Sequence, residues 1–175
     1  MPAEKNVALC GFMGSGKTAI GRELSNILGF DFMDMDEQIE KEAGLKIPEI
    51  FSRYGEAFFR NLEKKACTDL SAKSGYVIST GGGAVADAHN MEVIKKSARV
   101  VFIDTPFEVC MERIRRDINR PMASSRTDEE LRALYDSRRE SYEKSDLIYL
   151  ADRKNAAECA KEIARLLKRG EKNNG

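Results

Sequence analysis

Residues 11–18 read Gly11-Phe12-Met13-Gly14-Ser15-Gly16-Lys17-Thr18. They follow the apolar run Val7–Cys10, which is typical of a buried strand, and they open a helical stretch, Thr18–Leu28. Glycines at such a turn let backbone N–H groups point inward, and the helix N-terminus adds the positive end of its dipole. This arrangement predicts a phosphate-binding loop. The alternative is a turn that only joins strand to helix, which the complete pattern in this context disfavours.

The end of this loop carries side chains suited to a nucleotide and a metal ion. Lys17 can reach the β- and γ-phosphates of ATP, and the Thr18 hydroxyl is a suitable ligand for Mg²⁺. We therefore predict ATP as a substrate and Mg²⁺ as a cofactor. The expected nucleotide contacts from this segment are Gly14, Ser15, Gly16, Lys17, Thr18 and Ala19.

Length and composition indicate one ordinary soluble domain over residues 1–175. Lys+Arg and Asp+Glu number 29 each, so the overall charge favours neither nucleic acid nor a membrane surface as a partner. No apolar run approaches a membrane span, and the first residues do not resemble a signal peptide. The four cysteines are scattered without metal-ligand or redox spacing, which favours reduced packing residues in a cytoplasmic protein.

The chain alternates short apolar strands with helices, which predicts an α/β fold whose parallel sheet is covered on both faces. The expected strands are Val7–Cys10, Phe30–Met33, Tyr76–Ser79, Arg99–Asp104 and Leu147–Leu150. The expected helices are Thr18–Leu28, Asp36–Ala43, Ile47–Tyr54, Glu56–Ala72, Asn90–Lys96, Pro106–Arg115, Thr127–Lys144 and Ala156–Leu167. The polar tail, residues 169–175, is expected to be frayed.

Asp34 and Asp36 follow the second expected strand. If the chain stays extended, residues two apart point to the same side, so the two carboxylates would lie together. Two like charges at the carboxyl end of a strand need compensation, which Mg²⁺ and a substrate hydroxyl would each supply. The alternative is a pair of helix-capping acids, with Asp36 as the cap of the next helix.

Two further segments fit the same edge of the sheet. Three glycines, Gly81–Gly83, follow the third expected strand and allow close approach of the backbone to a ligand, although alone they could be a flexible turn. Residues 116–126 are basic, contain Pro121 and lack apolar periodicity. Such a segment is typical of a lid over an anionic ligand, and the alternative is an ordinary exposed loop.

Helical periodicity separates two arginines. Arg138 lies on the apolar stripe of its helix, where a charge needs an anionic partner such as a substrate carboxylate or an internal acid. Arg139 lies off that stripe. Arg60 points away from the apolar face of its own helix, beside Glu56 and Glu63, so periodicity alone indicates a salt-bridged surface residue.

The combined motifs resemble the bacterial shikimate kinases. The resemblance rests on Gly11–Thr18, Asp34-x-Asp36, Gly55-Glu56-x-x-Phe59-Arg60, Gly81–Ala84, Arg120-Pro121, and Arg138 four residues before Tyr142. It implies a three-layer α/β/α P-loop kinase fold with a five-stranded parallel sheet. The implied activity is ATP-dependent phosphorylation of the 3-hydroxyl of shikimate, in chorismate and aromatic amino-acid biosynthesis. Residues of about 34–63 would bind shikimate, and about 114–126 would form the lid.

The resemblance also implies roles for single residues. Asp34 would bind Mg²⁺ through water together with Thr18, and Asp36 would orient or deprotonate the attacking hydroxyl. Lys17 and the lid residue Arg120 would neutralise the transferred phosphoryl group. The implied remaining contacts are Arg60 and Arg138 to the shikimate carboxylate, Gly82 and Gly83 to the ring hydroxyls, and Arg113 to the adenine. For Arg60, the role that the resemblance implies replaces the interpretation as a salt-bridged surface residue.

The sequence departs from the family pattern at three places. Met122 stands where the family usually has Leu, a volume-conserving change. The family's Pro-Leu-Tyr ending is here Glu140-Ser141-Tyr142, which leaves the choice between Arg138 and Arg139 as carboxylate-binding residue open. The adenine loop, residues 152–155, matches loosely.

Two other functions compete with this interpretation. A gluconate or nucleotide kinase would share the phosphate loop but needs a different acceptor site from Asp36, Arg60, Gly82 and Arg138. A nucleotide-binding regulator without transfer chemistry would be expected to have lost Lys17, Asp36 or Arg120, and all three are present. The absence of a long unpaired apolar stripe favours a monomer.

Overall fold

The computed structural model describes residues 5–117 and 126–173. These residues contain a five-stranded sheet in the order β2-β3-β1-β4-β5, in which every neighbouring pair is parallel. The strands are β1 (Asn6–Cys10), β2 (Asp31–Asp34), β3 (Tyr76–Ser79), β4 (Ala98–Asp104) and β5 (Leu147–Leu150). The five-stranded parallel sheet is therefore confirmed.

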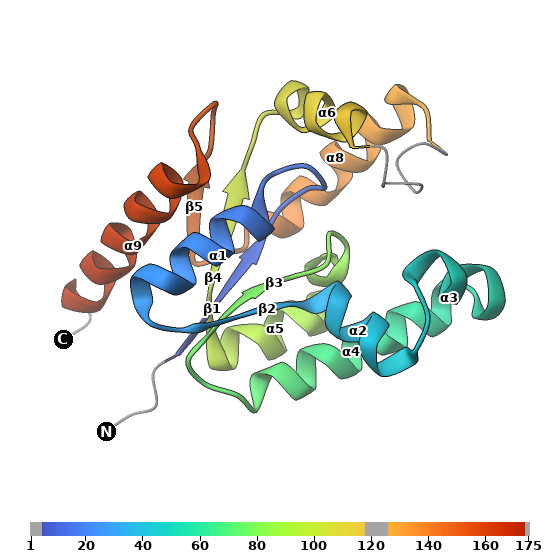
Figure 1. The fold of residues 1–175 in the computed structure, drawn as a ribbon, viewed down its shortest axis with the longest axis horizontal. Helices are drawn as coiled ribbons and strands as arrows, with labels where there is room; N and C mark the ends of the chain where they lie inside the picture. The colour runs from blue at the N-terminus through green and yellow to red at the C-terminus, as the bar shows by residue number, and fades with distance from the viewer. Residues whose placement is uncertain (1–4, 118–125, 174–175) are drawn as a thin grey trace.

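Helices connect these strands and lie on both sides of the sheet (Figure 1). They are α1 (Lys17–Leu28), α2 (Met35–Ala43), α3 (Ile47–Tyr54), α4 (Glu56–Ser71), α5 (Ala88–Ser97), α6 (Phe107–Arg116), α8 (Asp128–Tyr142) and α9 (Ala156–Asn173). A short 3-10 helix, η1 (Ala84–Ala86), follows the three glycines and was not expected from the sequence.

Alternate residues of the buried strands build two apolar layers. Val7 and Leu9 of β1 face one layer, which α1 and α9 complete. Ala8 and Cys10 face the other layer, which includes residues of α4, α5 and α8. Because both faces are covered, β1 is buried along its whole length, as is typical of a parallel strand.

Most predicted boundaries agree with the structure to within one or two residues. The exception is the end of the chain: α9 continues to Asn173, six positions past the expected end at Leu167. The expectation that residues 169–175 are frayed is therefore wrong for residues 169–173, which are helical. Polar composition alone did not indicate an end here, because a helix with one apolar stripe can carry many charged residues.

The carboxyl ends of the five parallel strands lie at one edge of the sheet, where β1 leads into α1 through the glycine loop and β2 leads directly into α2 (Figure 1). This edge is where open α/β sheets bind ligands. All four cysteines are buried and free, as expected for packing residues. Among the described helices none has the length and apolar character needed to cross a membrane.

Candidate active site

The phosphate loop joins β1 to α1 in the predicted strand–loop–helix arrangement. Gly16 caps α1 with a φ of 96°, and no side chain accepts a hydrogen bond from the first turn. The backbone N–H groups of that turn therefore face the loop, where an anion would neutralise them. Lys17 curls back so that Nζ donates to the carbonyl oxygens of Gly11 at 2.7 Å and Phe12 at 3.2 Å.

Helix α6 packs closely against the phosphate loop. Gly14 has a φ of 77°, and a Cβ atom there would lie 2.7 Å from the carbonyl oxygen of Cys110. Arg113 donates to the carbonyl oxygen of Gly14 at 3.1 Å. The Ser15 Oγ atom is buried and has no hydrogen-bond partner among the described residues. Gly14, Ser15, Gly16 and Arg113 thus lie together.

Thr18 and Asp34 approach one another across the edge of the sheet. The Thr18 hydroxyl donates to Asp34 Oδ2 at 3.2 Å. Asp34 Oδ1 accepts from the backbone N–H of Glu37 at 3.1 Å, which makes Asp34 the N-cap of α2. A hydroxyl beside a carboxylate offers hard oxygen ligands of the kind Mg²⁺ prefers. No group of three or more His, Cys, Asp or Glu side chains suited to a metal occurs in the described part of the chain.

Asp36 is the most perturbed acid at this edge. Its pKa is raised to about 6, mainly by burial and further by the charge of Asp34, while Lys17 opposes the rise. Its Oδ1 atom is buried and has no hydrogen-bond partner among the described residues. A carboxylate with a raised pKa and an unpaired oxygen can accept a proton from a hydroxyl placed beside it.

The argument from strand alternation that paired Asp34 with Asp36 is wrong in its geometry. Strand β2 ends at Asp34 and α2 begins at Met35, so Asp36 lies in the first helical turn. The alternative that Asp36 caps the helix is also wrong, because Asp34 is the cap. The carboxylates are nevertheless close enough for the charge of Asp34 to act on Asp36.

Two arginines from different helices converge on the glycine segment. A Cβ atom on Gly83 would lie 2.7 Å from Arg60 Nη1 and 3.1 Å from Arg138 Nη2. A Cβ atom on Gly82 would lie 3.3 Å from Arg138 Nη1. Both guanidinium groups therefore lie close over this backbone, where they can bind a carboxylate in the bidentate manner.

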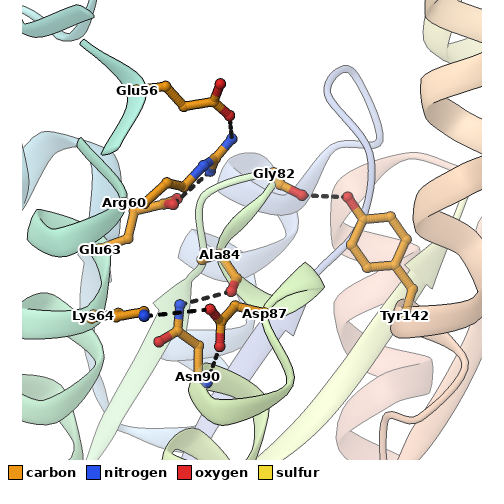
Figure 2. A network of polar contacts seen from close by, with 9 residues as sticks. All are labelled: Glu56, Arg60, Glu63, Lys64, Gly82, Ala84, Asp87, Asn90 and Tyr142. Carbon is orange, nitrogen blue, oxygen red and sulfur yellow. Dashed lines mark hydrogen bonds and ion pairs between the residues drawn. The ribbon is translucent and has the colours of Figure 1, made fainter. Parts of the chain in front are cut away.

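Arg60 also makes the ion pairs that periodicity predicted. Its guanidinium contacts Glu63 at 2.6 Å and Glu56 at 3.5 Å (Figure 2). Burial raises the pKa of Glu63, and the hydrogen bond from Arg60 opposes that rise. The sequence did not indicate that Glu63 is only 1% exposed. Its face of α4 is covered by the glycine segment, so the salt-bridged face borders the site.

The two neighbouring arginines of α8 have different surroundings. Arg139 makes a bidentate pair with Asp104, with Nη1–Oδ1 at 2.9 Å and Nη2–Oδ2 at 2.8 Å. Arg138 has no carboxylate within 4.0 Å among the described residues, and it faces Gly82 and Gly83. Arg138 is thus the one of the two that is available to an anionic ligand.

A hydrogen bond that sequence reasoning missed fixes the same backbone. The Tyr142 hydroxyl donates to the carbonyl oxygen of Gly82 (Figure 2). Asn90 Nδ2 donates to the carbonyl oxygen of Ala84 at 3.0 Å on the other side of the segment. The sequence pattern named Tyr142 as part of the family motif but not this hydrogen bond, because a motif does not report the partner of a buried hydroxyl.

One predicted residue cannot be placed in this arrangement. Arg120, assigned to the lid, lies outside the described residues, which end at Asp117 and resume at Arg126. The elements on either side of the lid are described: α6 ends at Arg116 and α8 begins at Asp128.

Comparison with known proteins identifies relatives over most of the chain. The model of the family described as shikimate kinase matches residues 13–168. The shikimate kinase of Aquifex aeolicus is 43% identical over 157 residues, which are 90% of this chain and 92% of that protein. That of Persephonella marina is 39% identical over 159 residues, which are 91% of this chain and 96% of the relative.

The chain belongs to the shikimate kinase family.

Solved structures support membership of the shikimate kinase family through the fold. A shikimate kinase from Acinetobacter baumannii in complex with shikimate superposes with a TM-score of 0.89 at 34% identity, covering 95% of this chain and 94% of that one. A sugar kinase from Janibacter superposes with a TM-score of 0.58 at 17% identity, which indicates a shared fold alone. The shikimate kinase from Acinetobacter baumannii thus shares both sequence and fold with this chain, whereas the sugar kinase shares its architecture alone.

Proposed function

We propose that this enzyme transfers the γ-phosphoryl group of ATP to the 3-hydroxyl of shikimate, giving shikimate 3-phosphate and ADP. The reaction would serve chorismate and aromatic amino-acid biosynthesis. The observation that carries the proposal is the convergence of Arg60 and Arg138 over Gly83, with Asp36 at the neighbouring Gly81. Two cations and a proton acceptor suit a small polyhydroxy acid better than a neutral sugar or a nucleotide.

The phosphate loop would hold ATP through backbone N–H groups of residues 14–19, with Lys17 at the β- and γ-phosphates. Phosphoryl transfer depends on positioning and on neutralising charge more than on covalent help. We assign Arg113 to the adenine, because it already contacts the loop through Gly14. Arg120 is assigned to the transferred phosphoryl group on its place in the family's sequence pattern.

The acceptor side would bind shikimate between α4, α8 and the glycine segment. Arg60 and Arg138 would hold the carboxylate, while Gly82 and Gly83 contact the ring hydroxyls. Asp36 would accept the proton of the attacking hydroxyl at its unpaired Oδ1 atom. A pKa of about 6 leaves this carboxylate mostly deprotonated at neutral pH yet basic enough to take that proton.

Mg²⁺ would be held by the Thr18 hydroxyl and, through water, by Asp34. The 3.2 Å contact between the two oxygens places both donors at the mouth of the phosphate loop. When bound, the ion would neutralise phosphate charge. We expect loss of turnover on chelation with EDTA and recovery on adding MgCl₂ in excess.

We further propose that the enzyme acts as a monomer in the cytoplasm. The sequence shows no long unpaired apolar stripe, which supports a monomer. Buried free thiols are typical of a reducing compartment. Light scattering at assay concentrations, combined with the activity measured at the same dilution, tests the monomer.

The direct test is ADP release by the purified protein with MgATP, with and without shikimate. Gluconate and nucleoside monophosphates serve as alternative acceptors. Stimulation by shikimate alone is the expected result. Turnover on another acceptor without turnover on shikimate would overturn the acceptor assignment, and no turnover on any acceptor would favour a nucleotide-binding regulator.

A further inference from the structure

Helix α8 is fastened to the carboxyl end of β4 by one arginine of the Arg138–Arg139 pair. The two guanidinium nitrogens of Arg139 bind both oxygens of Asp104, and its Nε atom lies 3.0 Å from Glu143. The same guanidinium lies over the ring of Phe102, 5.7 Å from its centroid. All three guanidinium nitrogens of Arg139 thus contact carboxylates of the protein, so the group has a structural role within α8 and β4.

Asp104, which binds Arg139, is itself held firmly at the end of β4. It is the last residue of β4, which pairs with β1 on one side and β5 on the other. Its carbonyl oxygen also accepts from the N–H of Ala151 at 2.9 Å. The Asp104 side chain is only 13% exposed, so a bidentate pair with it fixes both the distance and the direction of Arg139.

A second attachment one turn earlier on α8 reaches the phosphate loop. The Tyr135 hydroxyl donates to the carbonyl oxygen of Thr105 at 2.9 Å, and the Thr105 hydroxyl donates to the carbonyl oxygen of Ser15 at 2.9 Å. The Tyr135 ring also packs edge-on against Phe12 with centroids 5.2 Å apart. Thr105, which follows β4, thus connects α8, the helix that carries Arg138, to the phosphate loop.

Successive residues of an α-helix project about 100° apart, so fixing the direction of one fixes the direction of the next. With Arg139 held on Asp104, Arg138 projects towards Gly82 and Gly83. Without that pair, α8 could rotate about its axis and carry Arg138 away from Arg60.

We propose that Asp104 and Arg139 are positioning residues that set the direction of Arg138, and thereby the affinity of the acceptor site for a carboxylate. The inference rests on the proposed function, because its readout is the use of shikimate. The pair acts through Arg138 and touches neither substrate. Of these two consecutive arginines, Arg138 binds the ligand and Arg139 binds Asp104.

The test compares Arg139→Gln and Asp104→Asn with Arg138→Ala. Each positioning variant is expected to raise the KM for shikimate about tenfold and the KM for ATP by less than about twofold, since a small misplacement weakens an oriented contact. Arg132→Gln is the matched control, because Arg132 is an exposed arginine of α8 that pairs with Asp136 and Glu108. We expect that control to retain both KM values.

The decisive measurement is the double variant Arg138→Ala/Arg139→Gln. If Arg139 acts through Arg138, its loss adds nothing once Arg138 is gone, and the double variant matches Arg138→Ala in shikimate KM. If the double variant instead raises the shikimate KM by the product of the two single effects, the proposal is wrong. It is also wrong if a positioning variant raises the KM for shikimate and the KM for ATP equally. A lower melting temperature with an unchanged shikimate KM would also contradict it. Wild-type protein without shikimate-dependent turnover would instead refute the proposed function itself.

Discussion

The Oδ1 atom of Asp36 lies 2.7 Å from the position that a Cβ atom would occupy on Gly81. The carboxylate of the proposed proton acceptor therefore rests directly on the backbone of the glycine segment. Two residues further along, the same backbone lies under the guanidinium groups of Arg60 and Arg138. The backbone of Gly81–Gly83 thus lies beneath both the proposed proton acceptor and the proposed carboxylate-binding arginines.

This arrangement predicts different consequences for two neighbouring glycines. Gly81→Ala should displace the short, buried Asp36 side chain and lower kcat by at least about tenfold, because the proton acceptor loses its alignment. Gly83→Ala should displace the longer arginine side chains and mainly raise the KM for shikimate. Steady-state kinetics on both variants check the difference. The same change of kcat and KM in the two variants would contradict it.

The raised pKa of Asp36 predicts a pH dependence of activity. The value of about 6 describes the free enzyme, so kcat/KM for shikimate should fall as the pH drops below about 6. Asp36→Asn should lower kcat/KM by about 100-fold or more and remove this dependence. A profile of kcat/KM from pH 5 to 8 tests both statements. An unchanged inflection in Asp36→Asn would assign the titration to another group.

The same pKa predicts that Asp36 destabilises the fold at neutral pH. A carboxyl whose pKa is raised on folding binds its proton more tightly in the folded state, so stability falls as the pH rises from about 4 through 6. A rise from 3.8 to about 6 corresponds to about 3 kcal/mol. Asp36→Asn should therefore unfold at a higher denaturant concentration at pH 7 and show little difference at pH 4. An Asp36→Asn variant that is less stable at pH 7 would be inconsistent with this account.

Arg60 and Arg138 should differ in their effect on stability. Arg60→Ala removes the 2.6 Å partner of the buried Glu63, which should cost about 3 kcal/mol of unfolding free energy at pH 7. Because the pKa of Glu63 is already raised by burial, this penalty should shrink as the pH falls and Glu63 takes up a proton. Arg138→Ala should cost little stability.

Both arginine variants should raise the KM for shikimate far more than the KM for ATP. Denaturant unfolding at pH 5 and pH 7, combined with kinetics, separates the two roles. If Arg138→Ala raised both KM values equally, Arg138 would be structural and would not bind the substrate.

Lys17→Met should abolish phosphoryl transfer while leaving the fold intact. The ammonium group is oriented by the carbonyl oxygens of Gly11 and Phe12, and its loss removes a charge facing the transferred group. We expect kcat to fall by at least about 100-fold. Lys65→Met, which removes an exposed lysine of α4 paired with Glu42 and Asp69, is the control. Appreciable turnover by Lys17→Met would refute the role given to Lys17.

The phosphate loop and the sheet were predictable because their signals are local. A strand, a glycine turn and a helix N-terminus follow one another within about twenty residues, so residues 6–28 define their own structure. Alternating apolar strands and helices then require a covered parallel sheet. The pairing of Arg60 with Glu56 and Glu63 was predictable for the same reason, since helix spacing alone brings these side chains together.

Only the tertiary structure determined which groups Glu63, Arg138 and Arg139 contact. Helix spacing placed Glu63 on an exposed face, yet the glycine segment from a distant part of the chain buries it. The apolar stripe favoured Arg138 over Arg139 as the ligand-binding arginine, and the position of Asp104 at the end of β4 shows what Arg139 binds instead. The physical reason is that periodicity reports which residues share a face, whereas burial, pKa shifts and ion pairs depend on the elements that pack against that face.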